Sequence, residues 1–320
     1  MTDLTENSSI ADLQNLPYWL PGELLINSES AGESNMNLVL RIQTNQRSLI
    51  LKQSKPYVRK YPQIPAPIGR IAVEHRFLEL VSGEEFLAEM SPKVVQFDPE
   101  QHILIMEDLG KGLDYSWIYS GKRDLNEGEV EQLVGYLNQL HGLKVTDFPD
   151  NLEMRRLNHE HVFRFPFLEE NGFDLDSIQP GLQAISLAYK TDPRLKEKLE
   201  ALGGRYLRHG TVLLHGDFYP GSWLDVPSGI KVIDPEFGFP GDAEFDLGVF
   251  LAHLDLGQQP ESLKEQVLSA YCHRFDLDLV QQYRGVEILR RLIGIAQLPI
   301  DLTLSQKAEL LNNGKYLILN

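Results

Sequence analysis

The segment that most constrains the fold of this chain is LLHGDFYPGSWLDVPSGIKVIDPEFG, residues 213–238 of 320. Two short strand-like runs, WLDV and IKVI, flank the turn-prone tripeptide PSG, so the sequence predicts a β-hairpin that reverses near Ser228. A turn centred at this residue places Ser222 across from Asp234, and it brings Asp217 to the same end of the ribbon. The hairpin is therefore expected to gather polar side chains at one place.

Two carboxylates at the end of the second strand indicate a cation site. Pro235 disfavours helical geometry at Asp234, and residues two apart in an extended segment point the same way, so Asp234 and Glu236 should project together. They repel each other unless a cation lies between them, and Mg²⁺ suits this place because it takes one or two carboxylates together with substrate phosphate. Asp217, in a glycine-containing loop before the ribbon, is then placed to orient or deprotonate a hydroxyl. Phosphoryl transfer requires this combination of groups.

Each of these motifs also has an ordinary structural explanation. A lone Asp-Pro-Glu is usually a turn with solvated acids, and a lone His-x-Asp usually reflects local hydrogen bonding. The catalytic interpretation becomes specific because a hairpin of suitable length joins the two motifs.

The charge balance excludes one broad class of partner. The chain has 30 Lys and Arg residues against 46 Asp and Glu residues, which gives a net charge of −16. Binding to a nucleic-acid backbone needs a basic surface. We therefore expect no nucleic-acid partner, and we interpret most of the surplus carboxylates as solvated helix faces.

Cysteine content and hydropathy indicate a reducing compartment. The single cysteine, Cys272, cannot form an internal disulfide, and the start MTDLTENSSI has neither the basic residues nor the apolar core of a secretory signal. No uninterrupted apolar run in the sequence reaches about 18 residues, so no membrane span is expected. These features predict a cytoplasmic protein without a membrane partner.

The first third of the sequence predicts a small β-rich unit. NLVLRI and SLILK are strand-like runs joined by the turn-prone QTNQR, and a proline-rich connection follows. RIAVEHRFLELV then has helical spacing, and HILIMEDLGKG indicates a buried strand that leads into a glycine-bounded linker. We place a domain boundary near Leu109, after this strand.

Beyond the linker the hydrophobic pattern becomes helical. An apolar stripe covers residues 130–140, and the segments from about 176 to 202 and from about 260 to 298 have similar spacing. The sequence thus predicts an α+β protein with a unit over residues 1–109 and a mostly helical unit over residues 110–320.

Several dispersed motifs together resemble the aminoglycoside phosphotransferase and choline kinase superfamily. The motifs are HGD, a metal-ligand position five residues after its aspartate, the strand end IDPE, and DAEFDLG. Within this superfamily the chain is most similar to 5-methylthioribose kinases, which have serine and Asp-x-Glu, here Ser222, Asp234 and Glu236, where most relatives have asparagine and Asp-Phe-Gly. Similarity in ESNMNLVLRI, LILKQSKPYVRK, ILIMEDL and ILRRLIGIAQ extends the resemblance from about residue 30 to about residue 300. It implies a protein-kinase-like fold with a small β-rich N-lobe, which binds nucleotide, and a larger, mostly helical C-lobe, which holds the acceptor.

Departures from the family pattern concern the acceptor and the nucleotide loop. HGDFYPGS has Tyr219 and Pro220 where the family has histidine and threonine. The loop GESNMN, residues 32–37, which would cover the nucleotide, has fewer glycines than the family usually has. The chain is also shorter than the methylthioribose kinases, so the resemblance specifies the reaction more closely than the acceptor.

The resemblance implies a set of nucleotide-binding residues. Lys52, at the end of the strand SLILK, would hold the α- and β-phosphates of ATP, and Glu74 on the following helix would be its ion-pair partner. The alternative is an exposed lysine and an exposed glutamate. In the loop that would cover the nucleotide, the further candidates are Asn35 and Asn37. At the end of the strand ILIME, the backbone of Glu107 and Leu109 would contact adenine. The alternative there is an ordinary buried strand end.

The resemblance also assigns catalytic roles to Asp217 and to the pair Arg290 and Arg291. Adjacent helical residues point about 100° apart, so both arginines can face one ligand only near a helix end or a cleft, and otherwise one is exposed and one is salt-bridged. Methylthioribose kinases are similar in having an arginine pair here that helps hold the sugar and the transferring phosphoryl, a task that suits a permanently charged guanidinium. His215 and Asp246 are expected to brace the catalytic loop by hydrogen bonds.

These patterns lead to one main interpretation and two alternatives. We expect an ATP-dependent kinase that uses Mg²⁺ and transfers the γ-phosphoryl to a small-molecule hydroxyl, preferably of 5-methylthioribose. The first alternative is a kinase of the same superfamily for an aminoglycoside, a choline-like alcohol or another sugar. The second is an inactive nucleotide-binding regulator, which the altered DFYPG loop keeps open. A homodimer is also left open.

Overall fold

The structure, a computed structural model, describes residues 2–32 and 34–320, and the chain divides into two compact units. Unit 1 contains Met1–Gly112 and Val226–Phe237, and unit 2 contains Leu113–Asp225 and Gly238–Asn320. Two residues lie outside the described residues: Glu33, in the loop predicted to cover the nucleotide, and Met1, in the segment MTDLTENSSI. The assignment of nucleotide and acceptor functions to residues 1–109 and 110–320 stays a prediction.

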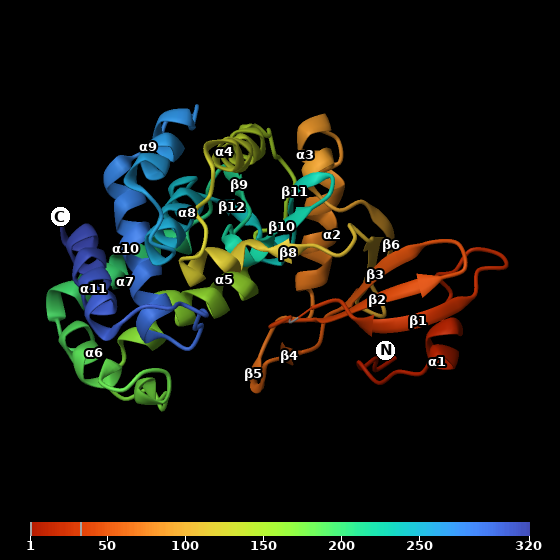
Figure 1. Cartoon of the computed structure of the whole chain (residues 1–320), viewed down its shortest axis with the longest axis horizontal. Helices are drawn as coiled ribbons and strands as arrows, with labels where there is room; N and C mark the ends of the chain where they lie inside the picture. The colour runs from red at the N-terminus through yellow and green to blue at the C-terminus, as the bar shows by residue number, and fades with distance from the viewer. Residues whose placement is uncertain (1, 33) are drawn as a thin grey trace. The chain divides into compact units, whose positions relative to one another are not determined.

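Unit 1 is built on a five-stranded sheet in which each pair of neighbouring strands is antiparallel (Figure 1). Its inner face forms because β2 alternates buried and less buried residues, with Leu38, Leu40 and Ile42 buried. The short helix α1, Ile10–Gln14, contributes Leu13 to the same core. In spatial order the strands are β1 Leu25–Ser30, β2 Leu38–Thr44, β3 Ser48–Gln53, β7 Ile103–Glu107 and β6 Val94–Asp98.

The remaining elements of unit 1 include the helix predicted from RIAVEHRFLELV. This helix is α2, Arg70–Val81, and it packs against the 3₁₀ turn η6, Pro235–Phe237. The helix α3, Glu85–Met90, packs against β11, Gly229–Val232. The proline-rich connection contains a two-stranded ribbon of β4, Tyr57–Val58, and β5, Tyr61–Pro65.

Unit 2 is mainly helical, and its centre is the long helix α10, which packs against α8 and α11 (Figure 1). The helices of this unit are α4 Glu127–Gly142, α5 Leu152–His159, α6 Leu182–Lys190, α7 Pro193–Tyr206, α8 Glu244–Leu256, α9 Glu261–Ala270, α10 Leu277–Ile293 and α11 Leu304–Leu319. Its shorter elements are β8 Leu113–Asp114, η1 Tyr115–Ser120, η2 Glu160–Arg164, η3 Phe165–Phe167, η4 Leu175–Ser177, β9 Val212–Leu214, η5 Pro220–Ser222 and β12 Phe239–Gly241, and β10 Trp223–Val226 extends from unit 2 to the first residue of the second segment of unit 1. The sheet of unit 1 and these helices confirm the predicted α+β class.

Two of the helices approach α10 through glycine. A Cβ added to Gly285 of α10 would lie 2.4 Å from the carbonyl oxygen of Gly314 on α11. A Cβ on Gly248 of α8 would lie 2.7 Å from the Cβ of Tyr283 on α10. These two contacts therefore require residues without a side chain.

The long helical segments predicted from the sequence are interrupted. The first contains η4, α6 and α7, and the second contains α9 and α10. Aspartates cap the N-termini of two of these helices. Asp192 of α7 accepts bonds from the backbone N–H groups of Arg194 and Leu195. Asp276 of α10 accepts bonds from those of Asp278 and Leu279. Capping chemistry thus divides what hydrophobic spacing alone would join.

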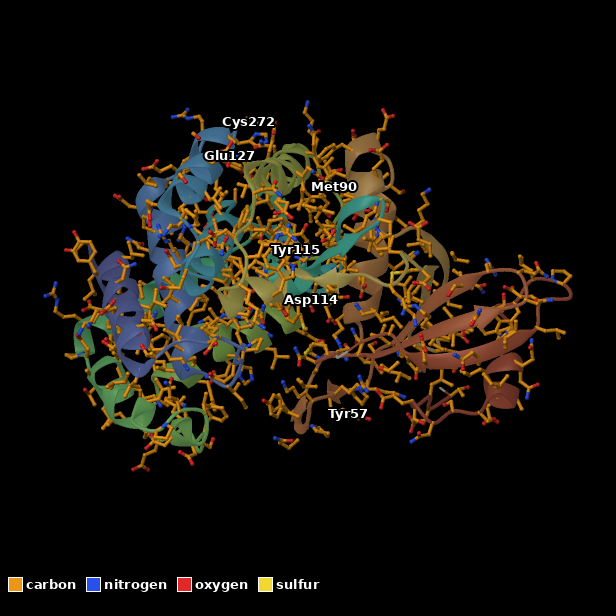
Figure 2. The ribbon with its side chains drawn as sticks, in the orientation of Figure 1. Tyr57, Met90, Asp114, Tyr115, Glu127 and Cys272 are labelled. Atoms are coloured by element: carbon orange, nitrogen blue, oxygen red, sulfur yellow. The ribbon has the colours of Figure 1, made fainter. Side chains whose placement is uncertain are left out.

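The predicted hairpin has its strands at β10 and β11, with a turn at Pro227 and Ser228. In unit 2, β10 pairs with β8, and Leu224 lies opposite Asp114. The side chain of Asp114 accepts a bond from the N–H of Ser116 and caps η1, at the junction labelled by Asp114 and Tyr115 in Figure 2. In residues 2–32 and 34–320, no helix combines the length and the apolar character that a membrane crossing needs.

Candidate active site

Lys52 lies near the end of β3 in unit 1 and forms two ion pairs. Its Nζ lies 2.8 Å from Oε1 of Glu74 on α2 and 2.6 Å from Oδ1 of Asp234, which precedes η6. Lys52 and Glu74 are each 1% exposed, whereas the side chain of Asp234 is 45% exposed. The ion pair predicted between Lys52 and Glu74 is thus present, and the alternative of two exposed side chains is wrong.

The electrostatics of this cluster follow from burial and from close charges. Burial alone would lower the pKa of Lys52, but Asp234 and Glu74 raise it above its ordinary value. Burial raises the pKa of Glu74 to about 7, although the charge of Lys52 opposes this shift. Lys52 therefore carries a permanent charge that Glu74 and Asp234 hold in place.

Asp234 has the one backbone geometry here that the sequence did not predict. Its φ is 63°, and the next three residues form the 3₁₀ turn η6, so the predicted extended segment is wrong. Pro235 disfavours right-handed helical geometry at Asp234, and aspartate is one of the residues that tolerates the left-handed region. A non-glycine residue held at positive φ stores strain, and such residues often occur at functional sites.

Glu236 and Asn37, predicted for metal and nucleotide, contact each other in unit 1. Nδ2 of Asn37 donates to Oε2 of Glu236 at 2.9 Å, and Nε of Arg70 lies 3.1 Å from the same oxygen. Arg70 also donates to Oδ1 of Asn37 at 3.0 Å and to the carbonyl of Met36 at 2.8 Å. Arg70, which sequence analysis missed, therefore ties the loop before β2 to the Asp-Pro-Glu segment.

The donor set fits a magnesium ion at Asp234 better than at Glu236. Among the residues that the structure describes, no group of three or more His, Cys, Asp or Glu side chains is placed to hold a metal ion. Mg²⁺ needs only one or two protein carboxylates when phosphates complete its shell. The carboxylate of Glu236 is buried and already bound by Asn37 and Arg70, whereas the side chain of Asp234 is 45% exposed and open to a ligand from solvent.

The other nucleotide candidates, Asn35, Glu107 and Leu109, also belong to unit 1. The hydrogen bonds described for them involve other residues than the Lys52 cluster. Asn35 is exposed, and its carbonyl accepts from the N–H of Lys60 at 3.0 Å. The N–H of Glu107 donates to the carbonyl of Lys93 at 2.9 Å, so this backbone donor is already engaged. Leu109 follows Asp108, whose carboxylate receives two bonds from Arg41 and fixes the start of the linker.

Asp246 holds the HGD loop of unit 2 through hydrogen bonds to its backbone. The carboxylate of this buried residue, in the first turn of α8, accepts from the backbone N–H of His215 at 2.7 Å and of Gly216 at 3.0 Å. Gly216 has a φ of 82°, which favours glycine. Asp246 thus lies at the start of α8 and braces the loop through the backbone N–H groups of residues 215 and 216, as predicted. His215 is buried, and its Nδ1 lies 3.4 Å from the N–H nitrogen of Asp217.

Asp217 lies beside both predicted arginines. Its Oδ1 is 3.4 Å from Nη2 of Arg291 and 3.7 Å from Nη2 of Arg290. Ser222, on the same unit, donates from Oγ to the carbonyl of Asp217 at 3.0 Å. The predicted juxtaposition of Ser222 with Asp234 joins one residue of each unit and stays a prediction.

Both arginines are buried, so the alternative of one exposed and one salt-bridged arginine is wrong. They lie in the last turn of α10 and both bind Glu287, which is one turn earlier on the same helix and was not singled out from the sequence. The spacing of three and four residues between an acid and two arginines was the signal that could have found it. The guanidinium of Arg291 also lies 4.7 Å from the ring centre of Tyr219, one of the two loop residues expected to depart from the family pattern.

Comparison with solved structures defines the class of protein. The chain has a protein-kinase-like fold, similar to a choline/ethanolamine kinase family protein from Mesorhizobium loti, with a TM-score of 0.56 and 18% identity over 97% of this chain and 93% of that one. It is also similar to the choline kinase LicA from Streptococcus pneumoniae, with a TM-score of 0.51 and 15% identity over 92% of this chain and 93% of that one. At these identities the likeness describes the fold.

Sequence comparison defines the family. A family model described as "Phosphotransferase enzyme family" matches residues 30–284, and the chain belongs to this family. It is 30% identical over 285 residues to the methylthioribose kinase of Geobacillus kaustophilus, which covers 82% of this chain and 68% of that protein. It is 29% identical over 263 residues to the methylthioribose kinase of Exiguobacterium sibiricum, which covers 76% of this chain and 64% of that protein. The chain thus spans about two thirds of the length of these relatives.

Proposed function

We propose that this protein transfers the γ-phosphoryl of ATP to a hydroxyl of a small neutral sugar, with 5-methylthioribose as the preferred acceptor. The observation that carries the proposal is the placement of both Arg290 and Arg291 within 3.7 Å of Oδ1 of Asp217. Two fixed cations beside the residue that would bind the acceptor hydroxyl favour an acceptor with oxygen groups. Guanidinium groups only donate hydrogen bonds, so they disfavour choline or an aminoglycoside, whose cationic groups need acceptors or carboxylates there.

The proposed roles divide between the two units. In unit 1, Lys52, held by Glu74, would bind the nucleotide phosphates, and Asp234 would hold Mg²⁺ together with them. The ion, when bound, would neutralise charge on the phosphate oxygens. The family also suggests Glu236 and Ser222 as ligands, Asn35 and Asn37 as loop residues over the nucleotide, and the backbone at Glu107 and Leu109 for adenine.

Asp217 of unit 2 would orient the acceptor hydroxyl and accept its proton as the new O–P bond forms. Arg290 and Arg291 would steady a sugar oxygen and the negative charge that develops on the transferring phosphoryl. The guanidinium of Arg291 stays charged because burial, which alone would lower its pKa, is outweighed by Glu287 and Asp217. His215 and Asp246 fix the backbone on which Asp217 stands.

An acceptor panel tests this proposal. The full chain is incubated with ATP and Mg²⁺, and ADP release is followed with 5-methylthioribose, ribose, other neutral sugars, choline, ethanolamine and a set of aminoglycosides. We expect turnover with 5-methylthioribose and none with the cationic acceptors, and Asp217→Asn controls for contaminating kinases. Turnover with choline or an aminoglycoside alone overturns the sugar assignment, and no turnover with any acceptor supports the inactive regulator.

A different neutral sugar is the second candidate, and one contact favours it. The Tyr219 ring lies under Arg291 and has its centre 5.1 Å from that of His253. By the resemblance, Tyr219 stands where the family has histidine, and its larger ring would give the acceptor site of this chain a different shape. Preferred turnover with another sugar in the same panel identifies this case.

A further inference from the structure

Glu287 binds both arginines of unit 2 through one carboxylate. Its Oε1 lies 2.7 Å from Nε of Arg291 and 2.9 Å from Nη2 of Arg290, and its Oε2 accepts from Nε of Arg290. Glu287 is 1% exposed. Burial by itself would raise the pKa of Glu287, but Arg290 and Arg291 hold it well below its usual range. The carboxylate is therefore charged and bound by the two guanidinium groups that lie beside Asp217.

A second set of hydrogen bonds holds Glu287 from the opposite side. Nε2 of His253, on α8, lies 3.0 Å from Oε1 of Glu287, and Nδ1 of His253 lies 2.5 Å from the hydroxyl oxygen of Tyr119, on η1. Burial lowers the pKa of His253 to about 4, so its ring is neutral at pH 7. A charged carboxylate only accepts, so Nε2–H donates to Glu287, and Nδ1 accepts from the Tyr119 hydroxyl.

The contact distances show which atoms of the two guanidinium groups face Glu287 and which face Asp217. Glu287 engages Nε of both arginines, and the Nη2 atoms reach Asp217 at the longer distances of 3.4 and 3.7 Å. A guanidinium held at Nε has its Nη2 direction fixed, since the group is planar. Glu287 also balances one of the two positive charges of the arginine pair.

We propose that Glu287, itself fixed by His253 and Tyr119, is a positioning residue that orients both arginines for phosphoryl transfer at Asp217. The inference rests on the proposed function of Arg290 and Arg291 and deepens it. It means that three buried residues, Glu287, His253 and Tyr119, affect catalysis through the arginines.

The main test compares Glu287→Gln with the wild type in the full chain. Removing the charge releases the Nε side of both arginines, so we expect kcat to fall about 10- to 100-fold, the scale found when a buried partner of a functional group is lost. KM for ATP should change little, because the nucleotide residues belong to unit 1. Glu287→Asp keeps the charge, and it should recover part of the lost kcat.

Asp255→Asn is the matched control for a merely structural effect. Asp255 is also a buried carboxylate with two cationic partners, Arg284 of α10 and Lys264 of α9, and it lies on α8. Its substitution removes an equivalent buried ion pair from the same helices. We expect Asp255→Asn to lower the thermal unfolding temperature while kcat stays close to that of the wild type. An equal loss of kcat in Asp255→Asn and Glu287→Gln overturns the proposal.

Tyr119→Phe covers the case in which Glu287→Gln does not fold, because it removes one hydroxyl and no charge. The Tyr119 hydroxyl is bonded to His253, which binds Glu287, so we expect kcat to fall about 2- to 10-fold, the effect of one hydrogen bond. Phe substitution at Tyr189 of α6, whose hydroxyl donates to Asn312 elsewhere in unit 2, provides the control and should leave kcat unchanged.

A spectroscopic measurement separates this proposal from the choice of substrate. NMR of protein labelled with ¹⁵N-arginine reports the Nε–H signals of Arg290 and Arg291, assigned by Arg→Lys substitution, without any acceptor. Glu287→Gln and Tyr119→Phe should shift these signals and speed their exchange with water. If the wild type turns over no acceptor, the proposed function fails, and the signals alone then decide on the positioning. Unchanged signals in both variants overturn the inference, as does unchanged kcat in an active enzyme.

Discussion

At the level of single residues, His253 shows how a buried imidazole makes the stability of the fold depend on pH. It is 0% exposed, and it lies between a hydroxyl donor and a charged carboxylate. In the unfolded chain the same imidazole is exposed to water and has its ordinary pKa of 6.5, whereas in the folded protein burial lowers the pKa to about 4. The unfolded state therefore binds a proton in a pH range where the folded state does not.

This difference predicts a pH dependence of stability. The contribution of His253 to the free energy of unfolding is fully present above pH 6.5 and is lost progressively as the pH falls from 6.5 towards 4. His253→Gln keeps a donor towards Glu287 but cannot titrate, so its free energy of unfolding should fall less steeply in this window. Urea unfolding at a series of pH values measures both slopes, and the difference removes the effect of other titrating groups. Identical slopes would show that His253 does not titrate between the two states.

At the level of elements, the start of α2 illustrates how one side chain organises several segments of unit 1. Arg70, the first residue of the helix, donates from Nη1 to the carbonyls of Lys55 and Pro67, each at 2.8 Å. Its other bonds reach Met36, Asn37 and Glu236. The helix is thereby joined to the loop before β2, to the proline-rich connection and to η6 through a single buried guanidinium.

Arg70→Met is predicted to destabilise the protein strongly. The substitution removes the guanidinium that lies 3.1 Å from the buried carboxylate of Glu236, and breaking a buried ion pair costs about 3–5 kcal/mol. Arg76→Met on the same helix is the control, because the side chain of Arg76 is 42% exposed and its ion pair with Glu79 is long, at 3.7 Å. Its effect should stay within about 0.5 kcal/mol. Urea denaturation measures both, and similar small effects would show that Arg70 is dispensable to the fold.

At the level of the whole molecule, the candidate residues divide according to the two units. Lys52, Glu74, Asp234 and Glu236 belong to unit 1, although the last two come from the hairpin in the middle of the second half of the sequence. Asp217, Arg290 and Arg291 belong to unit 2. Nucleotide binding and acceptor activation are therefore expected to be separable by mutation.

Two substitutions test this separation. Lys52→Ala should weaken ATP binding by about 10- to 100-fold, because a charge-assisted contact to phosphate is lost. Asp217→Ala should leave ATP affinity nearly unchanged and lower turnover by about 10²-fold or more, since it removes the proposed base. Calorimetry with ATP and Mg²⁺ and a turnover assay measure the two effects, and Lys111→Ala, whose side chain is 81% exposed, is the control for Lys52. An equal loss of binding and turnover in Asp217→Ala would show a structural role for Asp217.

The sequence predicted those features that depend on local patterns. The apolar spacing of RIAVEHRFLELV matches the bounds of α2, and the strand and helix context placed Lys52 and Glu74 for their ion pair. The position of Asp234 was predicted less well, because its left-handed backbone depends on contacts and not on the proline rule alone.

Features that depend on distant partners could not be predicted. Arg70 and Asn37 are separated by 33 residues, and His253 and Tyr119 by 134, so no local spacing relates them. Glu287 is different, because its bonds to Arg290 and Arg291 are local to α10. Its spacing was readable in the sequence, but an acid next to two arginines on a helix is usually an exposed ion pair, and only burial distinguishes this one.

The glycine contacts of α10 have a consequence for how this protein can evolve. The main chain of α11 touches α10 at Gly285, and α8 presents Gly248 to Tyr283, so no side chain can be shortened further to let α10 slide or turn. The height of the arginine pair along the helix is therefore fixed by main-chain contact. Because α10 tolerates little displacement, a change of the proposed acceptor is expected to come from the surrounding loops, such as the loop that contains Tyr219.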